Sequence, residues 1–411
     1  MTMRAIGNGE PRALGSLSRL ATAAVVAAAG RYLGDFTPRG RLDIEVPDGR
    51  RFRFEGEPDL EAAVAFRSLK PLFNGVRRGQ IGFAQSYIDR DIEADDLTTL
   101  LRFFLRNEAR FEALGRGIFR VRLPDRLYHL MRDNSKRQAR RNIEAHYDLS
   151  NEFYARWLDP GMTYSSAYFE DGANDLETAQ REKYRRIAEA ADLRAGDRVL
   201  EIGCGWGGFA ETAAGEHDTH VRGITLSPAQ LSYAQARLSK AGLDGRARLE
   251  LRDYRDTAGT FDRIVSIEMI EAVGEAHWPT YFRTLSDRLK TRGTVAIQAI
   301  TIGEPFFEGY RQGVDFIQRY IFPGGMLPTK TIIAEEARKA GLAVDGVDTF
   351  GQSYVRTLQE WRSRFEAAWP EISKLGFDET FRRKWEYYLS YCEAGFAEKV
   401  IDVGIYRLVK A

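Results

Sequence analysis

Three glycines in the stretch VLEIGCGWGGFA, residues 199–210, are the residues best placed to hold a ligand. Gly203, Gly205 and Gly207 follow an apolar run that predicts a buried strand, and they precede a pattern that predicts a helix. Glycine lets the backbone turn sharply and come close to a ligand because it has no Cβ. The first N–H groups of the helix behind them would be free to bind polar atoms. The stretch therefore predicts a ligand-binding turn at the end of a strand.

This glycine turn is ambiguous on its own, because dinucleotide-binding folds use a similar one. This turn has glycine at every second position, Gly203, Gly205 and Gly207, and an acidic residue, Glu201, before it. The spacing resembles that of class I S-adenosylmethionine (SAM) methyltransferases. We therefore favour SAM as the ligand over NAD, and over a purely structural turn.

The composition is that of a soluble globular protein. Of 411 residues, 44% are hydrophobic and 29% are charged, and 60 basic residues against 59 acidic ones leave a net charge of +1. Such a balance gives no overall field that would attract nucleic acid. The two cysteines, Cys204 and Cys392, predict neither a disulfide framework nor a metal site, which suits a reducing cytoplasm.

Residues 1–112 predict a small α+β domain. The apolar run over residues 21–29 is too short to span a bilayer, and we expect an amphipathic helix there rather than a signal peptide. Residues 41–55 alternate polar and apolar side chains around a Pro-Asp-Gly turn, which predicts a hairpin. Helical patterns follow over residues 60–73, 82–89 and 97–107, the last with an N-cap at Asp95 or Asp96.

Residues 113–145 form a connector in which basic and apolar side chains interleave. Such a pattern suits an anionic membrane surface, where each cation contributes about 1 kcal/mol. A solvated linker between two domains explains the same pattern, and the spacing alone favours neither.

Strand and helix patterns alternate through residues 146–411, which predicts an α/β domain with a doubly wound, Rossmann-like parallel sheet. Ligands bind such sheets at the carboxyl ends of the strands, where the glycine turn lies. The strand patterns fall within residues 199–202, 221–226, 247–256, 261–274, 294–302, 343–350 and 402–409, and a helical insertion covers residues 304–325.

Several sequence blocks in a fixed order make the chain resemble the cyclopropane-fatty-acyl-phospholipid synthase family, from about residue 40 to the end. One is the SAM turn already described. The others are HYDLSNEFYARWLDPGMTYSSAYF (146–169), SIEMIEAVG (266–274), FIQRYIFPGGMLPT (316–329) in the acyl-site insertion, and SYVRTLQEWRSRF (353–365). Five blocks in order are far more specific than one motif.

The resemblance implies a transferase of lipid biosynthesis that moves a one-carbon unit from SAM to the cis double bond of an unsaturated phospholipid acyl chain. The product would be a cyclopropane or a methyl-branched acyl chain, and the reaction needs no metal. The resemblance also implies a cytoplasmic protein peripheral to the inner face of the membrane, and a homodimer as in some relatives.

The resemblance further implies which residues hold SAM. The glycine turn and the residues after the second and third strands supply most of them, and the signature block supplies two. The implied cofactor residues are Tyr164, Ser165, Gly203, Gly205, Gly207, Thr225, Ser227, Gln230, Asp253 and Tyr254. A hydrogen bond from the adenine amino group to the Asp253 carboxylate would be chemically sensible, although an ordinary turn aspartate is the alternative.

The resemblance also implies a bicarbonate ion that acts as the base, held by a glutamate, a histidine, a tyrosine and backbone groups. Glu271 and Tyr354 match the glutamate and the tyrosine, and Ile300 matches a backbone position. The family's cysteine is Ser166 here, and its histidine is Gln298. Because an amide can donate a hydrogen bond but cannot carry a proton or a charge, ring closure to a cyclopropane is in doubt.

Glu268 is a further candidate, because the family often has a small or neutral residue at this position. If its side chain points inward, Glu268 would be a substitute base; if not, it would be a carboxylate at a strand end paired with an arginine. Two other functions compete with the proposed lipid transfer. One is a SAM methyltransferase for a small soluble nucleophile, and the other is a lipid-binding relative without catalysis.

Overall fold

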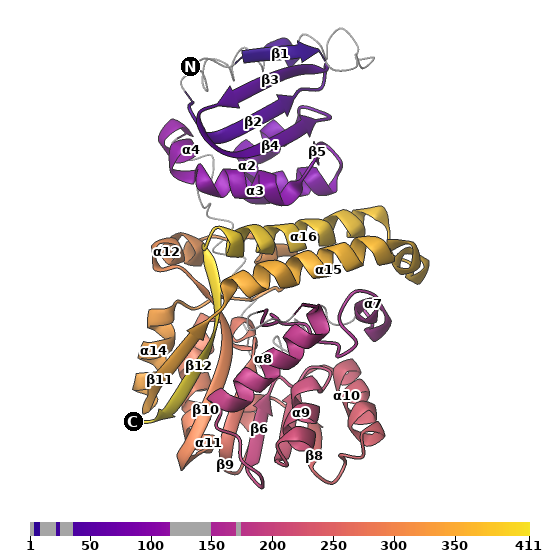
Figure 1. The fold of residues 1–411 in the computed structure, drawn as a ribbon. Coiled ribbons are helices and arrows are strands. Elements are labelled where there is room, and N and C mark those ends of the chain that lie inside the picture. Colours follow the sequence, from indigo (N-terminus) through magenta and orange to yellow (C-terminus); the bar gives the residue numbers. More distant parts are fainter. Residues whose placement is uncertain (1–3, 9–21, 25–35, 116–148, 170–173) are drawn as a thin grey trace. The chain divides into compact units, whose positions relative to one another are not determined.

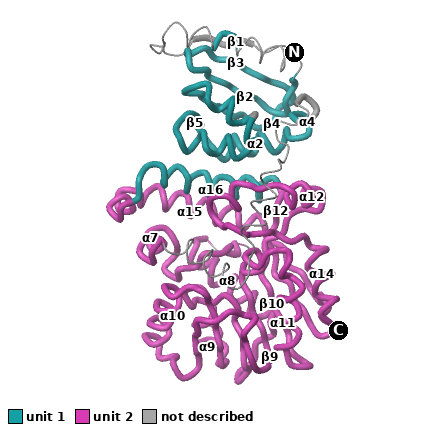
Figure 2. Tube along the Cα trace, turned by 180° about the vertical axis from the view of Figure 1, so that it is seen from behind, with its two compact units in different colours: residues 1–122, 377–398 teal, residues 123–376, 399–411 magenta. Residues whose placement is uncertain are grey.

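The structure is a computed structural model that describes residues 4–8, 22–24, 36–115, 149–169 and 174–411. It divides into two compact units, one of residues 1–122 with 377–398 and one of residues 123–376 with 399–411 (Figure 2). Residues 116–145 of the predicted connector lie outside the described residues, as does most of the helix expected over residues 21–29.

The first unit contains a five-stranded sheet in the order β1-β3-β2-β4-β5. The predicted hairpin is confirmed, because β2 and β3 pair antiparallel with Arg41 opposite Glu55. The predicted N-cap is confirmed at Asp96, whose carboxylate accepts a hydrogen bond from Thr99 N at 3.3 Å. The elements before residue 116 are β1 (Arg4–Asn8), β2 (Arg39–Glu45), β3 (Arg50–Glu55), β4 (Glu57–Phe66), α2 (Lys70–Ile88), β5 (Ile92–Ala94), α3 (Leu97–Arg106) and α4 (Glu108–Gly115).

The helix predicted over residues 60–73 is wrong in its first half, which forms strand β4. Ala62 and Val64 are buried at a spacing of two, and they pair in parallel with Leu42 and Ile44 of β2. The alanines of this segment favour a helix locally, but burial against β2 decides for the strand. Helix α2 then begins at Lys70 and ends at Ile88, so it contains all but the last residue of the helix predicted over residues 82–89.

Helix α16 (Glu379–Ala397) belongs to the first unit, although the sequence placed it with residues 146–411. Its Arg383 is buried and donates hydrogen bonds to the carbonyl oxygens of Tyr87 and Ile92, at 2.7 and 2.9 Å. The same guanidinium lies over the Tyr87 ring. A segment near the end of the chain thus completes the core of the first unit.

The second unit is built on a seven-stranded sheet in the order β11-β12-β10-β9-β6-β7-β8, which confirms the predicted α/β class (Figure 1). Strands β10, β9, β6, β7 and β8 are parallel, and β12 runs antiparallel to both of its neighbours. The strands are β6 (Arg198–Ile202), β7 (His220–Thr225), β8 (Ala247–Leu251), β9 (Phe261–Ile267), β10 (Leu289–Ile302), β11 (Leu342–Thr349) and β12 (Ile401–Lys410).

Helices cover both faces of this sheet, with α8 and α9 on one face and α11 and α14 on the other (Figure 1). The insertion over residues 304–325 forms two short helices, α12 and α13. The helices of the second unit are α7 (Asn151–Ala155), α8 (Leu176–Ala190), α9 (Gly208–Glu216), α10 (Pro228–Lys240), α11 (Trp278–Arg288), α12 (Glu304–Gln312), α13 (Phe316–Tyr320), α14 (Lys330–Lys339) and α15 (Gly351–Ile372), and short 3₁₀ turns include η1 (Tyr254–Asp256) and η2 (Ile270–Ala272).

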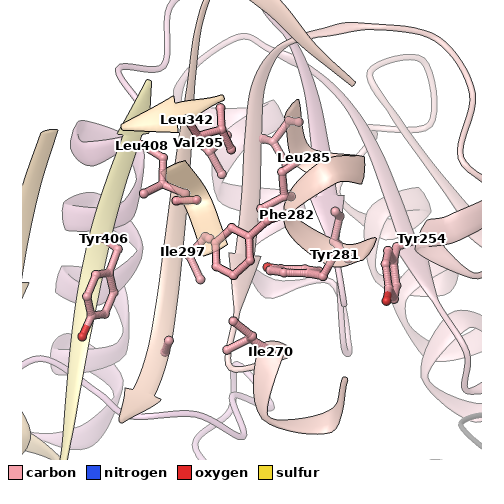
Figure 3. Packing of buried hydrophobic residues seen from close by; sticks show 14 of the residues in the cluster. Tyr254, Ile270, Tyr281, Phe282, Leu285, Val295, Ile297, Leu342, Tyr406 and Leu408 are labelled. Carbon is pink, nitrogen blue, oxygen red and sulfur yellow. The ribbon is translucent and has the colours of Figure 1, made fainter. Parts of the chain in front are cut away.

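The main core of the second unit anchors the segment that follows β9. Ile270 is fully buried in this core, and Figure 3 shows it beside Tyr281 and Phe282 of α11. The two carboxylates of the segment, Glu268 and Glu271, flank this anchor in the sequence. Burial of one isoleucine therefore fixes the backbone from which both carboxylates project.

Candidate active site

The glycine turn joins β6 to α9, as the sequence predicts. All three glycines have left-handed backbone angles, with φ of 83° at Gly203, 50° at Gly205 and 82° at Gly207. Gly207 is also the N-cap of α9. Other residues adopt this region only with strain, so the turn requires glycine for its shape.

Space around the turn differs from one glycine to the next. A Cβ on Gly207 would lie 2.9 Å from the Ala234 Cβ, and one on Gly203 would lie 3.1 Å from the Met269 Cγ. A Cβ on Gly205 would meet nothing within 4 Å in the described part of the chain. Gly207 and Gly203 therefore allow close packing of the protein, whereas Gly205 borders open space into which a ligand can come.

Glu201, at the end of β6, is buried directly before this turn. Its Oε2 atom has no hydrogen-bond partner among the residues that the structure describes. Burial raises the pKa of Glu201 to about 8, and the charges of Lys183 and Arg237 oppose that rise. An amino acid ammonium group, such as that of SAM, would supply the donor that Oε2 lacks, so the turn and Glu201 fit SAM together.

Two predicted cofactor residues lie in a loop that other elements hold firmly. The Ser165 hydroxyl accepts a hydrogen bond from Lys183 Nζ at 2.7 Å, and the Ser165 carbonyl accepts one from Gln180 Nε2 at 2.9 Å. The Tyr164 ring lies 5.3 Å, centroid to centroid, from Trp361. The Tyr354 ring, in turn, lies 6.1 Å from Trp361. Aromatic rings of this kind stabilise a neighbouring cation by about 1–2 kcal/mol when water is excluded.

Sequence reasoning missed Lys183, which is fully buried on α8. Burial lowers the pKa of Lys183 to about 8, and nearby Glu268, Asp159 and Glu201 oppose that change. The spacing in the sequence indicates its burial, because Lys183 lies four residues from Ala179 and from Ile187, which are both buried on the same helix. A lysine on the buried face of a helix indicates a buried counter-charge.

The signature block is connected to the glycine turn by side-chain hydrogen bonds. Trp206 Nε1 in the turn donates to Asn151 Oδ1 at 2.8 Å. Asn151 Nδ2 donates to the Ala229 carbonyl at the start of α10, at 3.2 Å. One asparagine therefore joins α7, the turn and α10. Other aromatic residues of the block, Phe153 and Tyr154, are fully buried and pack in the core.

Thr225, Ser227 and Gln230 form one buried network at the start of α10. The Thr225 hydroxyl bonds to Gln230 Oε1 at 3.0 Å, and it accepts from Ser227 N at 3.1 Å. Ser227 is the N-cap of α10, as predicted, because its hydroxyl accepts from Gln230 N. The network shapes the edge of the sheet beside the turn, and contact of these residues with SAM remains a prediction.

Asp253 and Tyr254 follow β8, and both have other contacts in this structure. The Asp253 carboxylate accepts hydrogen bonds from Arg255 N, at 2.9 Å, and from the Arg255 guanidinium, at 2.7 and 2.8 Å. Tyr254 is buried, and its ring lies 5.6 Å from that of Tyr281 (Figure 3). Their part in holding SAM also remains a prediction.

The carboxylate of Glu268 is the meeting point of three hydrogen bonds. Its Oε1 accepts from the Ser166 backbone N–H at 2.8 Å and from Gln298 Nε2 at 2.7 Å. Its Oε2 accepts from the Tyr354 hydroxyl at 2.8 Å. Glu268 therefore points inward and is not a strand-end carboxylate paired with an arginine.

Glu271 stands close to Glu268 but has fewer partners. Its Oε1 accepts a hydrogen bond from Ile300 N at 2.6 Å. Within the described residues, Glu271 Oε2 and Gln298 Oε1 are buried without a partner. Burial and the charge of Glu268 raise the pKa of Glu271 to about 8. All six predicted catalytic residues thus lie in two neighbouring groups, Ser166, Gln298 and Tyr354 on Glu268, and Ile300 on Glu271.

These residues do not fit the bicarbonate ion that the family resemblance implies. The donors expected to hold it, at Ser166, Gln298 and Tyr354, already bind the Glu268 carboxylate. A second anion there would face that carboxylate without a donor of its own, at a cost of several kcal/mol in a buried place. In the described part of the chain, no three His, Cys, Asp or Glu side chains lie close enough together to hold a metal ion.

Comparison with known proteins decides the family. Residues 134–405 match the family described as mycolic acid cyclopropane synthetase, which is more than half of the chain. The chain belongs to this family. A mycolic acid cyclopropane synthase, CmaA1, solved in complex with SAH and CTAB, is 31% identical with a TM-score of 0.62, and the match covers 66% of this chain and 98% of that one.

Longer relatives of the mycolic acid cyclopropane synthetase family match more of the chain. Tuberculostearic acid methyltransferase UfaA1 of Mycobacterium tuberculosis is 40% identical over 343 residues, 81% of this chain and 80% of that protein. Cyclopropane-fatty-acyl-phospholipid synthase of Escherichia coli K12 is 36% identical over 379 residues, 89% of this chain and 95% of that protein. Membership confirms the resemblance and makes this chain a SAM-dependent methyltransferase of class I fold.

Proposed function

We propose that this protein transfers a one-carbon unit from SAM to the cis double bond of unsaturated phospholipid acyl chains, giving a cyclopropane or a methyl-branched product. The observation that carries the proposal is the inward-facing pair Glu268 and Glu271, because the carbocation left by alkylation of an alkene gives a cyclopropane or a methylated alkene only by losing a proton to a base. The names of its relatives, a cyclopropane-fatty-acyl-phospholipid synthase and a tuberculostearic acid methyltransferase, support the same substrate class.

When bound, SAM supplies an electrophilic methyl group. We expect the turn at Gly203–Gly207, together with Glu201, Tyr164 and Ser165, to hold it. The chain's own contribution is position and exclusion of water, which an alkene needs because it is a weak nucleophile. Gln298 and Lys183 are fully buried, so the groups around the carboxylates are shielded from solvent.

The first turns of α2 in the first unit offer a surface for the membrane in which the lipid substrate lies. Leu72 and Phe73 are 38% and 64% exposed, which is unusual for large apolar side chains. Lys70, Arg77 and Arg78 are exposed on the same segment. Cations around exposed apolar side chains suit an anionic lipid surface. From these exposed side chains of α2 we infer peripheral attachment to the membrane. No helix in the described residues is long and apolar enough to cross a membrane.

The main experiment incubates the purified protein with oleoyl phospholipid vesicles and SAM whose methyl group carries three deuteriums. Mass spectrometry of the acyl chains then counts the label. A cyclopropane retains two deuteriums, because one leaves as the ring closes, and a chain methylated with loss of a chain hydrogen retains all three. Absence of label in the lipid would reject the proposal and favour a SAM methyltransferase for a small soluble nucleophile.

Vesicle sedimentation tests the membrane surface. We expect Phe73→Ser to weaken binding to vesicles that contain anionic phospholipid. Val347→Ser, which removes another exposed apolar side chain on β11 of the second unit, is the matched control and should bind like the parent. Equal binding by all three proteins would contradict a membrane contact at α2.

A further inference from the structure

We propose that the Glu268 carboxylate is the built-in base of the reaction and takes the place of an external bicarbonate ion. This role rests on the proposed transfer to an alkene, because it names the group that receives the released proton. It also explains why the donors of the site do not fit a second anion. Three elements that are distant in the sequence, the loop at Ser166, strand β10 and helix α15, all direct a donor to this one side chain.

The three donors favour the ionised form of Glu268, because hydrogen bonds to a carboxylate are stronger than those to a neutral acid. A backbone N–H and an amide NH₂ can only donate, so the Oε1 atom that faces Ser166 and Gln298 must accept twice. The buried ammonium of Lys183 adds a favourable charge. Burial raises the pKa of Glu268, but these donors and Lys183 oppose the rise. The part-buried Glu268 side chain therefore has three hydrogen-bond donors and a nearby ammonium that favour its carboxylate form, the form that can accept a proton.

The backbone at Glu268 is strained, which indicates that its direction is specific. Its φ is +46°, a left-handed angle that residues other than glycine adopt only at an energetic cost. Glu268 N also donates to the Gln298 carbonyl at 2.8 Å, which holds this conformation against β10. The strain persists because the surrounding hydrogen bonds aim the carboxylate inward.

The proton transfer balances without any further reactant. When the alkene π pair forms the bond to the incoming methyl carbon, the neighbouring chain carbon becomes a carbocation. Within the described residues, Glu268 Oε2 accepts one hydrogen bond, from Tyr354, which leaves it a lone pair for the proton. The electron pair of the broken C–H bond then closes the ring, if the proton left the methyl group, or forms a new double bond, if it left the chain.

Glu271 is less suited to this role. Among the residues that the structure describes, it accepts one hydrogen bond, at Oε1 from Ile300 N. Burial and the charge of Glu268 raise its pKa to about 8, so Glu271 holds its proton more tightly than an ordinary carboxyl group does. Two neighbouring carboxyl groups with different environments take different roles, and here Glu268 is the one that stays free to accept.

The first test measures turnover in buffer freed of carbon dioxide and again with added bicarbonate. We expect the parent to show the same rate in both. Glu268→Gln should lose about 10²–10⁴-fold in turnover with unchanged SAM affinity by calorimetry, because only the base is removed. Glu335→Gln, an exposed glutamate on α14, is the matched control and should behave like the parent. A parent rate that depends on bicarbonate, or a fully active Glu268→Gln, would overturn the assignment.

The second test uses Glu268→Gly, which removes the carboxylate and suits the left-handed backbone. Its vacated donors should bind carbon-13 formate, visible as broadening of the formate signal in NMR, and the parent should not. Formate or bicarbonate should restore part of its turnover. Equal formate binding by the parent and the variant would overturn the inference, even if the parent methylates no lipid. If only the variant binds formate and the parent transfers nothing to lipid, the proposed function alone is rejected.

Discussion

The Tyr354 hydroxyl donates a hydrogen bond to Glu268 Oε2 at 2.8 Å, and so joins the first turn of α15 to the end of β9. Thr357, one turn further along α15, accepts a hydrogen bond from Ala167 N at 3.1 Å. Ser353 accepts one from Phe169 N at 3.0 Å. One face of α15 therefore positions both the proposed base and the loop that carries Ser165 and Ser166.

Replacing Tyr354 with Phe should lower turnover about 10- to 100-fold, because a hydrogen bond to a charged group contributes about 1.5–3 kcal/mol. Loss of a donor to the ionised form should also raise the pKa of Glu268, so the acid side of the pH–rate profile should move to higher pH. Tyr233→Phe on α10 is the control. An unchanged pH–rate profile in Tyr354→Phe would mean that Tyr354 does not tune the base.

Alanine at Gly205 and at Gly207 should have different effects, although both glycines have left-handed φ angles. Gly207→Ala places a Cβ 2.9 Å from the Ala234 Cβ, so it should lower the free energy of unfolding by more than the roughly 1 kcal/mol of backbone strain. Gly205→Ala meets no protein atom within 4 Å in the described residues, so it should cost only that strain but abolish SAM binding.

Urea unfolding and calorimetry measure the two effects side by side. A Gly205→Ala protein that binds SAM like the parent would remove the cofactor from this turn. Similar free energies of unfolding for the two variants would show that Ala234 can move away from the new Cβ with little loss of stability.

Local sequence signals were enough for most of the fold. The N-caps at Asp96 and Ser227 and the parallel strands follow from short patterns, because the residues that decide them are neighbours in the chain. Strand β4 and helix α16 could not be read in this way. Residues of β4 form a strand because they are buried against β2. Helix α16 belongs to the first unit because Arg383 donates hydrogen bonds to Tyr87 and Ile92.

The site was predicted residue by residue but not as an arrangement. The family resemblance named Ser166, Gln298 and Tyr354, yet nothing local shows that all three bind Glu268. Their meeting depends on contacts between segments that are distant in the sequence. Lys183 was missed because the basic residues around it on α8 resemble a solvated face, although its spacing of four residues from the apolar Ala179 and Ile187 indicates the buried face of the helix.

Lys183→Met should destabilise the protein by about 3–5 kcal/mol, because it leaves buried carboxylates without their counter-charge. The change keeps a side chain of similar length in the space, so loss of charge dominates. Arg181→Met, an exposed position on the same helix, should stay within about 0.5 kcal/mol of the parent. Urea unfolding of the three proteins checks this, and equal losses in both variants would show that the charge of Lys183 contributes little.

The raised pKa of Glu271 predicts how stability depends on pH. In the folded protein the pKa is about 8, against an ordinary value of 4.5. Between these values the folded state keeps a proton that the unfolded state has released, so the free energy of unfolding falls as pH rises. The slope for one such group is at most about 1.4 kcal/mol per pH unit. The contribution is fully present below about pH 4.5 and lost above about pH 8.

Glu271→Gln should therefore be more stable than the parent at pH 8 and differ little from it at pH 5, because the amide has no proton to lose. Glu201, whose pKa is also about 8, should leave part of the slope in the variant. Urea unfolding at several pH values measures both curves, with Glu335→Gln as the control that should keep the parent's slope. If the free energies of unfolding of the parent and of Glu271→Gln change with pH in parallel, Glu271 is ionised in the folded protein at neutral pH. Glu271 could then accept a proton as well as Glu268.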